Sequence, residues 1–233
     1  MTQPSTLPEV SRVDRSLGAL ARRRVNGTFD VDPWGLDPDL VSLVGRLVPS
    51  VAVRTAGGGR LPDGPALCLW QGDGPGVLPL VVGLGAASTR PVRFCGVPDL
   101  GPLRAVASRL GGVGGHPADL RGLLRAGNLV AVRLDTSHSP GEEALAGVGW
   151  TGEDVGRGTR GDPTVQEWLP DEAVGAAIDV GAPVVPVRVT SPRPWSPLAR
   201  VAVGTPVPTR TRLAARSLAD VAEGLASAFR SLR

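Results

Sequence analysis

Short apolar runs recur along the chain and alternate with longer segments in which apolar residues follow a helical spacing. The runs are rich in valine and leucine, as strands buried on both faces are. They fall at residues 50–54, 66–70, 92–96, 129–134, 184–189 and 200–203. The helical spacing is found at residues 10–25, 38–48, 78–87, 100–110, 118–126, 165–179 and 213–232. Strands that alternate with helices predict an α/β fold, with a central, mostly parallel sheet flanked by helices and an additional N-terminal helix.

The boundaries of these elements are marked by residues with known local preferences. Asp37 is placed to cap the helix that begins at Pro38. Gly127 is placed to end the helix before it, in the conformation that glycine adopts most readily. The glycines of residues 111–115 predict a flexible loop. The acidic, Gly-rich residues 139–163 show no periodicity, so we expect a loop or lid there.

Length and composition indicate one α/β domain, or at most one domain with a small appendage. The 233 residues divide into a tail and amphipathic helix at residues 1–27 and an α/β domain at residues 28–233. The two cysteines, Cys68 and Cys95, lie in apolar runs, so we expect buried, reduced thiols and a cytoplasmic location. The polar start of the chain differs from a signal peptide, and no apolar run has the length of a membrane span.

The charge is unevenly distributed, and arginine supplies all of its strong bases. Acids dominate residues 135–179, whereas residues 188–233 contain eight arginines and only two acids. This basic end either contacts phosphates, of lipid headgroups or nucleic acid, or is a solvated surface. The few aromatic residues near it make nucleic acid the least favoured partner. The two histidines and two cysteines are too far apart for a metal-ligand motif, so we expect no metal site.

A second basic cluster ends the predicted N-terminal helix. Arg22, Arg23 and Arg24 suit the negative end of the helix dipole. An amphipathic helix with such a cluster either lies on an anionic membrane or packs on the domain. Membrane contact would make the protein peripheral, on the inner face of the membrane.

One segment carries the frame of a known active site. Residues 73–81 read Asp-Gly-Pro-Gly-Val-Leu-Pro-Leu-Val and follow the apolar run at residues 66–70. The frame resembles block one of the lysophospholipid (glycerolipid) acyltransferases, which in one bacterial branch reads roughly Asn-His-Ser-Gly-Thr-Leu-Pro-Leu-Asp. The Leu-Pro-Leu and one glycine are kept, but the family's His falls on Gly74 and its Asp on Val81.

Other elements resemble the same family in the same order. The aspartate-rich residues 30–40, whose acids we expect to form caps and turns, are similar to the entry of that branch. Residues 182–187 resemble its Gly-x-Pro-(Ile/Val)-Val-Pro strand, and residues 201–207 resemble its late Val-x-Ile-Gly-x-Pro strand. The resemblance runs from about residue 31 to residue 207 and implies a glycerolipid-acyltransferase-like fold.

The resemblance also implies what chemistry has been lost. In the family the block-one His is the general base that deprotonates the acceptor hydroxyl, and the Asp orients it. Gly74 and Val81 can do neither, so no catalytic residue is assigned. Asp73 and His138 are the available substitutes for the base, although an aspartate in a Gly-Asp-Gly-Pro sequence is typical of a turn.

The substrate-binding blocks have drifted as well. The second block corresponds to residues 109–117, which keep the glycines and lack the following Arg; His116 is the polar candidate there. In the third block, Phe-Pro-Glu-Gly in the family, Asp135 replaces Glu and Thr136 replaces Gly. Arg133, just before them, is placed to bind an anion.

These observations lead to three hypotheses. The first is a catalytically impaired acyltransferase homologue of phospholipid metabolism that binds an acyl chain or lysophospholipid, or is the partner of an active paralogue. The second is a working acyltransferase that uses substitute residues, with acyl-CoA or acyl-carrier protein as co-substrate and no bound cofactor. The third is a protein that binds anionic surfaces, of membranes or nucleic acid.

Overall fold

The computed structural model describes residues 31–47, 53–72, 77–88, 90–95, 104–114, 116–134, 169–191, 198–211 and 214–232. In chain order these form α2 (Pro38–Leu47), β1 (Val53–Ala56), η1 (Gly58–Arg60), β2 (Ala66–Gly72), α3 (Val77–Ala87), β3 (Val92–Cys95), α4 (Arg104–Arg109), β4 (Gly112–Val113), α5 (Pro117–Arg125), β5 (Leu129–Arg133), α7 (Leu169–Val180), β6 (Val184–Thr190), β7 (Ala199–Val203) and α8 (Leu218–Arg230). The expected N-terminal helix, Arg22, Arg23 and Arg24 within it, and the expected loop or lid at residues 139–163 lie outside the described residues.

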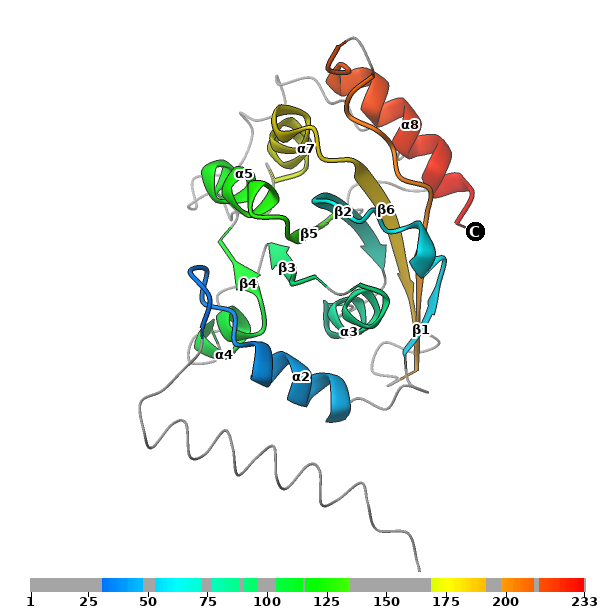
Figure 1. Cartoon of the computed structure of the whole chain (residues 1–233). Coiled ribbons are helices and arrows are strands. Elements are labelled where there is room, and N and C mark those ends of the chain that lie inside the picture. The colour runs from blue at the N-terminus through cyan, green and yellow to red at the C-terminus, as the bar shows by residue number, and fades with distance from the viewer. Residues whose placement is uncertain are drawn as a thin grey trace, which may run out of the picture.

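The described strands form one sheet in the order β1-β7-β6-β2-β5-β3-β4. β6, β2, β5, β3 and β4 run parallel, and β1 runs parallel to β7. The two groups meet where β6 and β7 pair antiparallel. Figure 1 shows the sheet between two layers of helices. The predicted α/β fold with a central, mostly parallel sheet is therefore confirmed.

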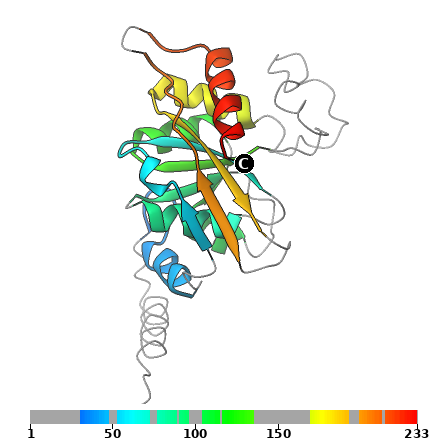
Figure 2. The same cartoon turned by 90° about the vertical axis from the view of Figure 1, so that its right-hand side faces the viewer.

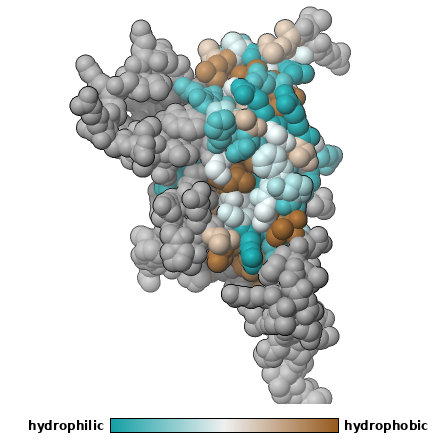
Figure 3. Space-filling view, turned by 90° about the vertical axis from the view of Figure 1, so that its left-hand side faces the viewer, coloured by the Kyte–Doolittle hydropathy of each residue, from teal (hydrophilic) through white to brown (hydrophobic). Residues whose placement is uncertain are grey.

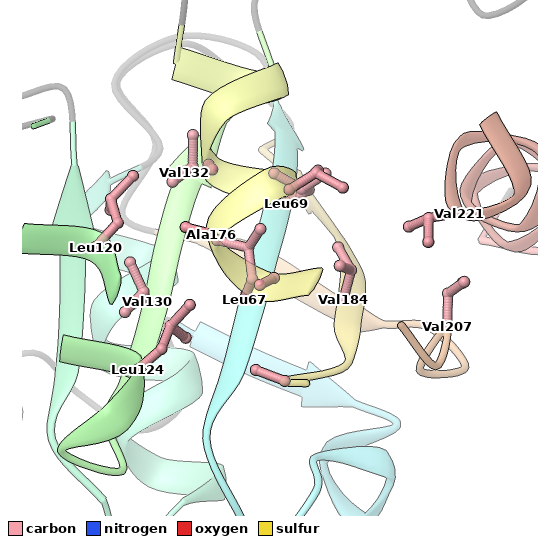
Figure 4. Close-up of a cluster of buried hydrophobic side chains, with 14 of the residues drawn as sticks. Leu67, Leu69, Leu120, Leu124, Val130, Val132, Ala176, Val184, Val207 and Val221 are labelled. Atoms are coloured by element: carbon pink, nitrogen blue, oxygen red, sulfur yellow. The ribbon is translucent and has the colours of Figure 1, made fainter. Parts of the chain in front are cut away.

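The first core layer lies between the sheet and α5, α7 and α8. Along β2, Leu67 and Leu69 project to this side, because alternate residues of a strand face opposite ways. Figure 4 shows them beside Val130 and Val132 of β5, with Ala176 of α7 close by. All these side chains are fully buried or nearly so. Burial on both faces explains why β2 and β5 are continuous apolar runs in the sequence.

The second core layer lies between the opposite face of the sheet and α3. It contains Ala66, Cys68 and Trp70 of β2 together with Leu80 and Leu84 of α3. Gly83 allows α3 to approach the sheet closely, because a β-carbon there would lie 2.7 Å from Cγ2 of Val201. The hydroxyl of Thr55 in β1 donates to the Gly83 carbonyl at 3.1 Å. α3 is thus held against the edge of the sheet formed by β1 and β7.

Local capping fixes two helix ends as the sequence predicts. The Asp37 carboxylate accepts from the backbone N–H groups of Asp39 and Leu40, both at 3.1 Å, and so caps α2. Gly127 follows α5 with a φ of 84°, in the left-handed region that favours glycine. Of the described helices, none is both long and apolar enough to cross a membrane.

The C-terminal helix is shorter than its sequence pattern predicts. We expected it from residue 213, but α8 begins at Leu218. Ser217 and Asp220 form a capping box in which each side chain accepts from the other's backbone N–H. Just before it, Arg210 and Ala215 form an isolated β-bridge. Ala215 is therefore in a β-bridge and Ser217 is extended, at positions where the apolar spacing alone indicates helix.

Two other boundaries differ from expectation because of strand pairing. Part of the expected flexible loop at residues 111–115 is the short strand β4, which pairs with Phe94 and Cys95 of β3. β1 reaches Ala56, two residues beyond the predicted strand, because it pairs with β7 as far as Ala202. Pairing of this kind joins segments distant in sequence, so local propensity does not reveal it.

Candidate functional site at the carboxyl edge of the sheet

The carboxyl ends of the three central parallel strands meet at one edge of the sheet. β2 ends at Gly72, β5 at Arg133 and β6 at Thr190. α3 begins at Val77, shortly after β2, so the described part of block one, residues 77–81, begins at this edge. In open α/β sheets, ligands bind outside the carboxyl ends of the strands. We therefore take this edge as the candidate site.

One arginine of the site is held on the face of the sheet that α3 covers. Arg133 lies opposite Trp70 in the β2–β5 register. Its guanidinium carbon lies 5.3 Å from the centroid of the Trp70 ring, within range of a cation–π interaction. Trp70 is 1% exposed, whereas Arg133 is only half-buried. The ring therefore supports the guanidinium while leaving part of it accessible.

A second arginine flanks the same strand on the opposite face. Gln71 lies opposite Arg188 in the β2–β6 register, and Nη2 of Arg188 donates to Oε1 of Gln71 at 3.4 Å. Because Trp70 and Gln71 are consecutive in β2, Arg133 and Arg188 lie on opposite sides of the sheet. The end of β2 is thus bordered by two half-buried cations, which favour an anionic group at this edge.

Val81, which the sequence resemblance aligns with the family's orienting aspartate, has apolar surroundings. Val81 lies in the second turn of α3 and packs, half-buried, against the cluster that contains Trp70, Leu80 and Leu84. The other candidates from the sequence, Asp73, Gly74, Asp135, Thr136 and His138, lie outside the described residues.

The structure gives His116 a local role away from β2. Its Nδ1 accepts from the backbone N–H of Ala118 at 3.3 Å, so the side chain caps α5. The cap follows β4, two strands from β5, which carries Arg133; two strand spacings correspond to roughly 10 Å across the sheet. His116 is therefore not brought together with Arg133.

A buried ionic cluster, missed in the sequence, lies on the face that α5 covers. Arg93 in β3 is fully buried and forms an ion pair with Asp32. Its Nε donates to Oδ1 of Asn128 at 3.3 Å, whereas its Nη1 is buried without a hydrogen-bond partner among the described residues. Burial lowers the pKa of Arg93 to about 10. The sequence feature that indicates this cluster is a charged residue inside an apolar strand, because a buried charge needs a partner.

The cluster fixes the segment before α2 against the domain. Oδ1 of Asp32 accepts from the backbone N–H groups of Trp34 and Leu36, each at 3.0 Å, and so forms a turn. The Trp34 ring lies over Gly122 of α5, where an added β-carbon would be 2.8 Å from the ring. As the sequence predicts, Asp32 and Asp37 form a turn and a cap. The ion pair with Arg93 is an additional role.

Neither cysteine has the properties of a nucleophile. Cys68 and Cys95 are free and buried. Burial raises the pKa of each thiol to about 12, so the reactive thiolate is scarce at neutral pH. Arg90, near Cys68, donates to the Pro62 carbonyl. Burial is also the main cause that lowers the pKa of Arg90.

No cluster of three or more metal-ligating side chains occurs among the described residues. On the face seen in Figure 3, hydrophilic residues predominate and hydrophobic residues lie in small, separate groups.

Comparison with known proteins gives a likeness of fold. No protein-family model and no curated protein matches the chain. Among solved structures, it is similar to the 1-acyl-sn-glycerophosphate (LPA) acyltransferase PlsC from Thermotoga maritima, with a TM-score of 0.51 and 16% sequence identity. The alignment covers 83% of this chain and 77% of that one. The chain therefore has an acyltransferase-like fold.

Proposed function

We propose that the protein is a catalytically impaired acyltransferase homologue that binds a lysophospholipid-type lipid at the carboxyl edge of its sheet. The observation that carries this proposal is that Arg133 and Arg188 lie on either side of the end of β2, with an aliphatic setting at Val81. The arginines suit a lipid phosphate. The base and its orienting carboxylate, however, are replaced by Gly74 and Val81.

The chemistry of the described residues at this edge supports binding over transfer. A hydroxyl attacks a thioester slowly unless a base takes its proton. Arginine stays protonated near neutral pH and cannot act as that base. Val81 lacks the carboxylate that would orient a histidine. A bound lipid would therefore be held without being acylated. The protein would act through lipid binding itself or as the partner of an active paralogue.

Binding is tested by isothermal titration calorimetry of the full chain with lysophosphatidic acid below its critical micelle concentration. Replacing Arg133 or Arg188 with Gln should weaken affinity by about ten-fold or more, because each loses charge-assisted hydrogen bonds to phosphate. Arg125→Gln is the matched control, because Arg125 is exposed at the far end of α5, next to the amino edge of the sheet. Absence of binding by the wild type would refute the proposal.

Catalysis is tested by thiol release from acyl-CoA and from acyl-carrier protein, with a panel of lysophospholipids. We expect no turnover above background. Turnover that disappears in Asp73→Asn or His138→Ala would instead establish a working enzyme with a substitute base. The double variant Gly74→His with Val81→Asp restores the family's pair. Acyl transfer by this variant would show that the binding site still accepts both substrates.

A further inference from the structure

Two arginines lie side by side at the edge of the sheet without an acidic partner among the residues that the structure describes. Arg54 of β1 is directly opposite Arg200 of β7 in the parallel register, so their α-carbons are about 4.8 Å apart. Both side chains are exposed. Neither makes a hydrogen bond or ion pair with another residue of the described ranges. Like charges placed directly opposite one another destabilise a sheet unless an anion lies between them.

The direction of these side chains follows from strand alternation. Val201 and Val203 project into the core beneath α3, so Arg200 and its neighbour Arg54 project from the opposite face. Arg188 of β6 projects from that face too, because Val187 and Val189 on either side of it are in the core beneath α3. Figure 2 shows this side of the molecule, where α8 lies near one end of β6 and no described helix crosses the start of β7.

An exposed hydrophobic side chain adjoins the arginine pair. Leu198 is 54% exposed and precedes Arg200 by two residues, which places it on the same face. Large exposed hydrophobic residues beside cations are typical of surfaces that contact anionic bilayers, because the cations meet headgroup phosphates while the hydrophobic residue enters the acyl region.

We propose that the arginine face, made of Arg54, Arg200 and Leu198, binds the surface of an anionic phospholipid bilayer. β1 and the start of β7 carry no described helix on this face, so their side chains are presented over an area rather than around one point, which matches a surface better than a small ligand. The arginine face shares the carboxyl edge of β6 with the candidate lipid site, so membrane contact would bring that site to the source of its ligand. This inference goes beyond the proposed lipid binding and does not depend on it.

The test is flotation of the full chain with two kinds of vesicle, phosphatidylcholine alone and phosphatidylcholine mixed with phosphatidylglycerol. The wild type should bind the anionic vesicles and lose binding as salt increases. Each arginine near the surface contributes about five-fold to the partition coefficient. The double variant Arg54→Gln with Arg200→Gln should therefore lower the partition coefficient about 25-fold. Contributions from distant parts of the chain add independently, so this ratio holds whatever else the chain contributes.

The matched control removes two arginines from the other end of the sheet. Arg125→Gln with Arg216→Gln has the same net charge as the test variant, but it leaves the arginine face intact and should change binding less than two-fold. Leu198→Gln should lower binding several-fold without changing net charge. Circular dichroism verifies that each variant is folded; Arg54, Arg125, Leu198 and Arg200 are exposed, whereas Arg216 is half-buried.

Three results would overturn the proposal. Equal binding to neutral and anionic vesicles would remove the role of charge, and equal losses in the test and control variants would remove the role of this face. The face would be assigned to nucleic acid if neither arginine double variant changed vesicle binding and the test variant lost binding of a single-stranded oligonucleotide. Competition by millimolar inorganic phosphate at constant ionic strength would indicate a discrete phosphate site instead of a surface.

Discussion

The carboxylate of Asp32 and the guanidinium of Arg93 are 61 residues apart in the chain and form an ion pair on the face of the sheet that α5 covers. Arg93 is fully buried, so its charge depends on Asp32 and Asn128 for compensation. The pair joins the segment before α2 to the third strand of the domain. Its contribution is measurable because the same protein contains an exposed pair for comparison.

Asp32→Asn should reduce the free energy of unfolding by roughly 2–3 kcal/mol, because it leaves a buried cation without its counter-ion while keeping a turn-forming oxygen. Urea denaturation measures the change. Asp179→Asn, which breaks the exposed pair with Arg121, should change stability by less than about 1 kcal/mol. Asp32→Asn with Arg93→Met should recover most of the loss; failure to recover would show that the carboxylate acts mainly through its turn.

The contact between Trp34 and Gly122 gives a second prediction about the same segment. A β-carbon at Gly122 would lie 2.8 Å from Cη2 of Trp34, so Gly122→Ala should destabilise the fold by about 1–3 kcal/mol. Gly85 in α3 is the matched control, because nothing lies within 4 Å of its added β-carbon. Gly85→Ala should stabilise by about 0.5–1 kcal/mol through helix propensity. Thermal denaturation that moves both variants in the same direction would contradict the packing assigned to Trp34.

The end of β2 should be sensitive to a single added methyl group. A β-carbon at Gly72 would lie 2.7 Å from the backbone oxygen of Val189, so Gly72→Ala must separate β2 from β6 beside the Gln71–Arg188 contact. We expect several-fold weaker binding of lysophosphatidic acid together with lower stability. Gly64→Ala, where nothing lies within 4 Å, should leave both unchanged. Normal lipid binding by Gly72→Ala would argue against Arg188 as a phosphate ligand.

The buried thiols predict a loss of stability at alkaline pH. Their pKa is about 12 in the folded protein against 9.0 when exposed, so the unfolded chain ionises first and binds fewer protons above pH 9. Stability is fully present below pH 9 and falls as pH approaches 12. Arg93 acts in the opposite sense above pH 10, where its lowered pKa favours the folded state. The net loss between pH 8 and pH 10 should be about 2 kcal/mol.

This pH dependence is unusually simple to measure in this chain. It contains no tyrosine and no lysine, whose side chains would otherwise titrate in the same range. Urea denaturation at pH 8 and pH 10 gives the difference, and Cys68→Ala with Cys95→Ala should abolish most of it. A double variant with the wild-type pH dependence would assign the loss to other groups.

The sequence was informative where a local pattern determines the structure. The run at residues 66–70 is the central strand β2, and Asp37 caps α2 as its position before Pro38 indicated. The fold class follows from such alternation of strands and helices. Arg133 was selected from the sequence, and the structure places it at the predicted strand end over Trp70.

Features that join distant segments were not predictable in the same way. Arg93 interrupts an apolar strand, and nothing in the neighbouring sequence indicates that Asp32 is its partner. The two-residue strand β4 depends on β3 for its existence. Arg188 lies at the site because β6 is the neighbour of β2 in the sheet. The order of the strands determines this, and the local sequence pattern does not.

That strand order has a consequence for synthesis of the protein on the ribosome. Both neighbours of β2 come later in the chain, and β6 begins more than a hundred residues after β2 ends. At about 5–20 residues per second, the edge of β2 facing β6 stays unpaired for roughly 6–22 s after β2 is made. An apolar strand with an open edge is prone to pair with other chains. We therefore expect yield of the folded protein to depend on chaperone supply and growth temperature more than its final stability would suggest.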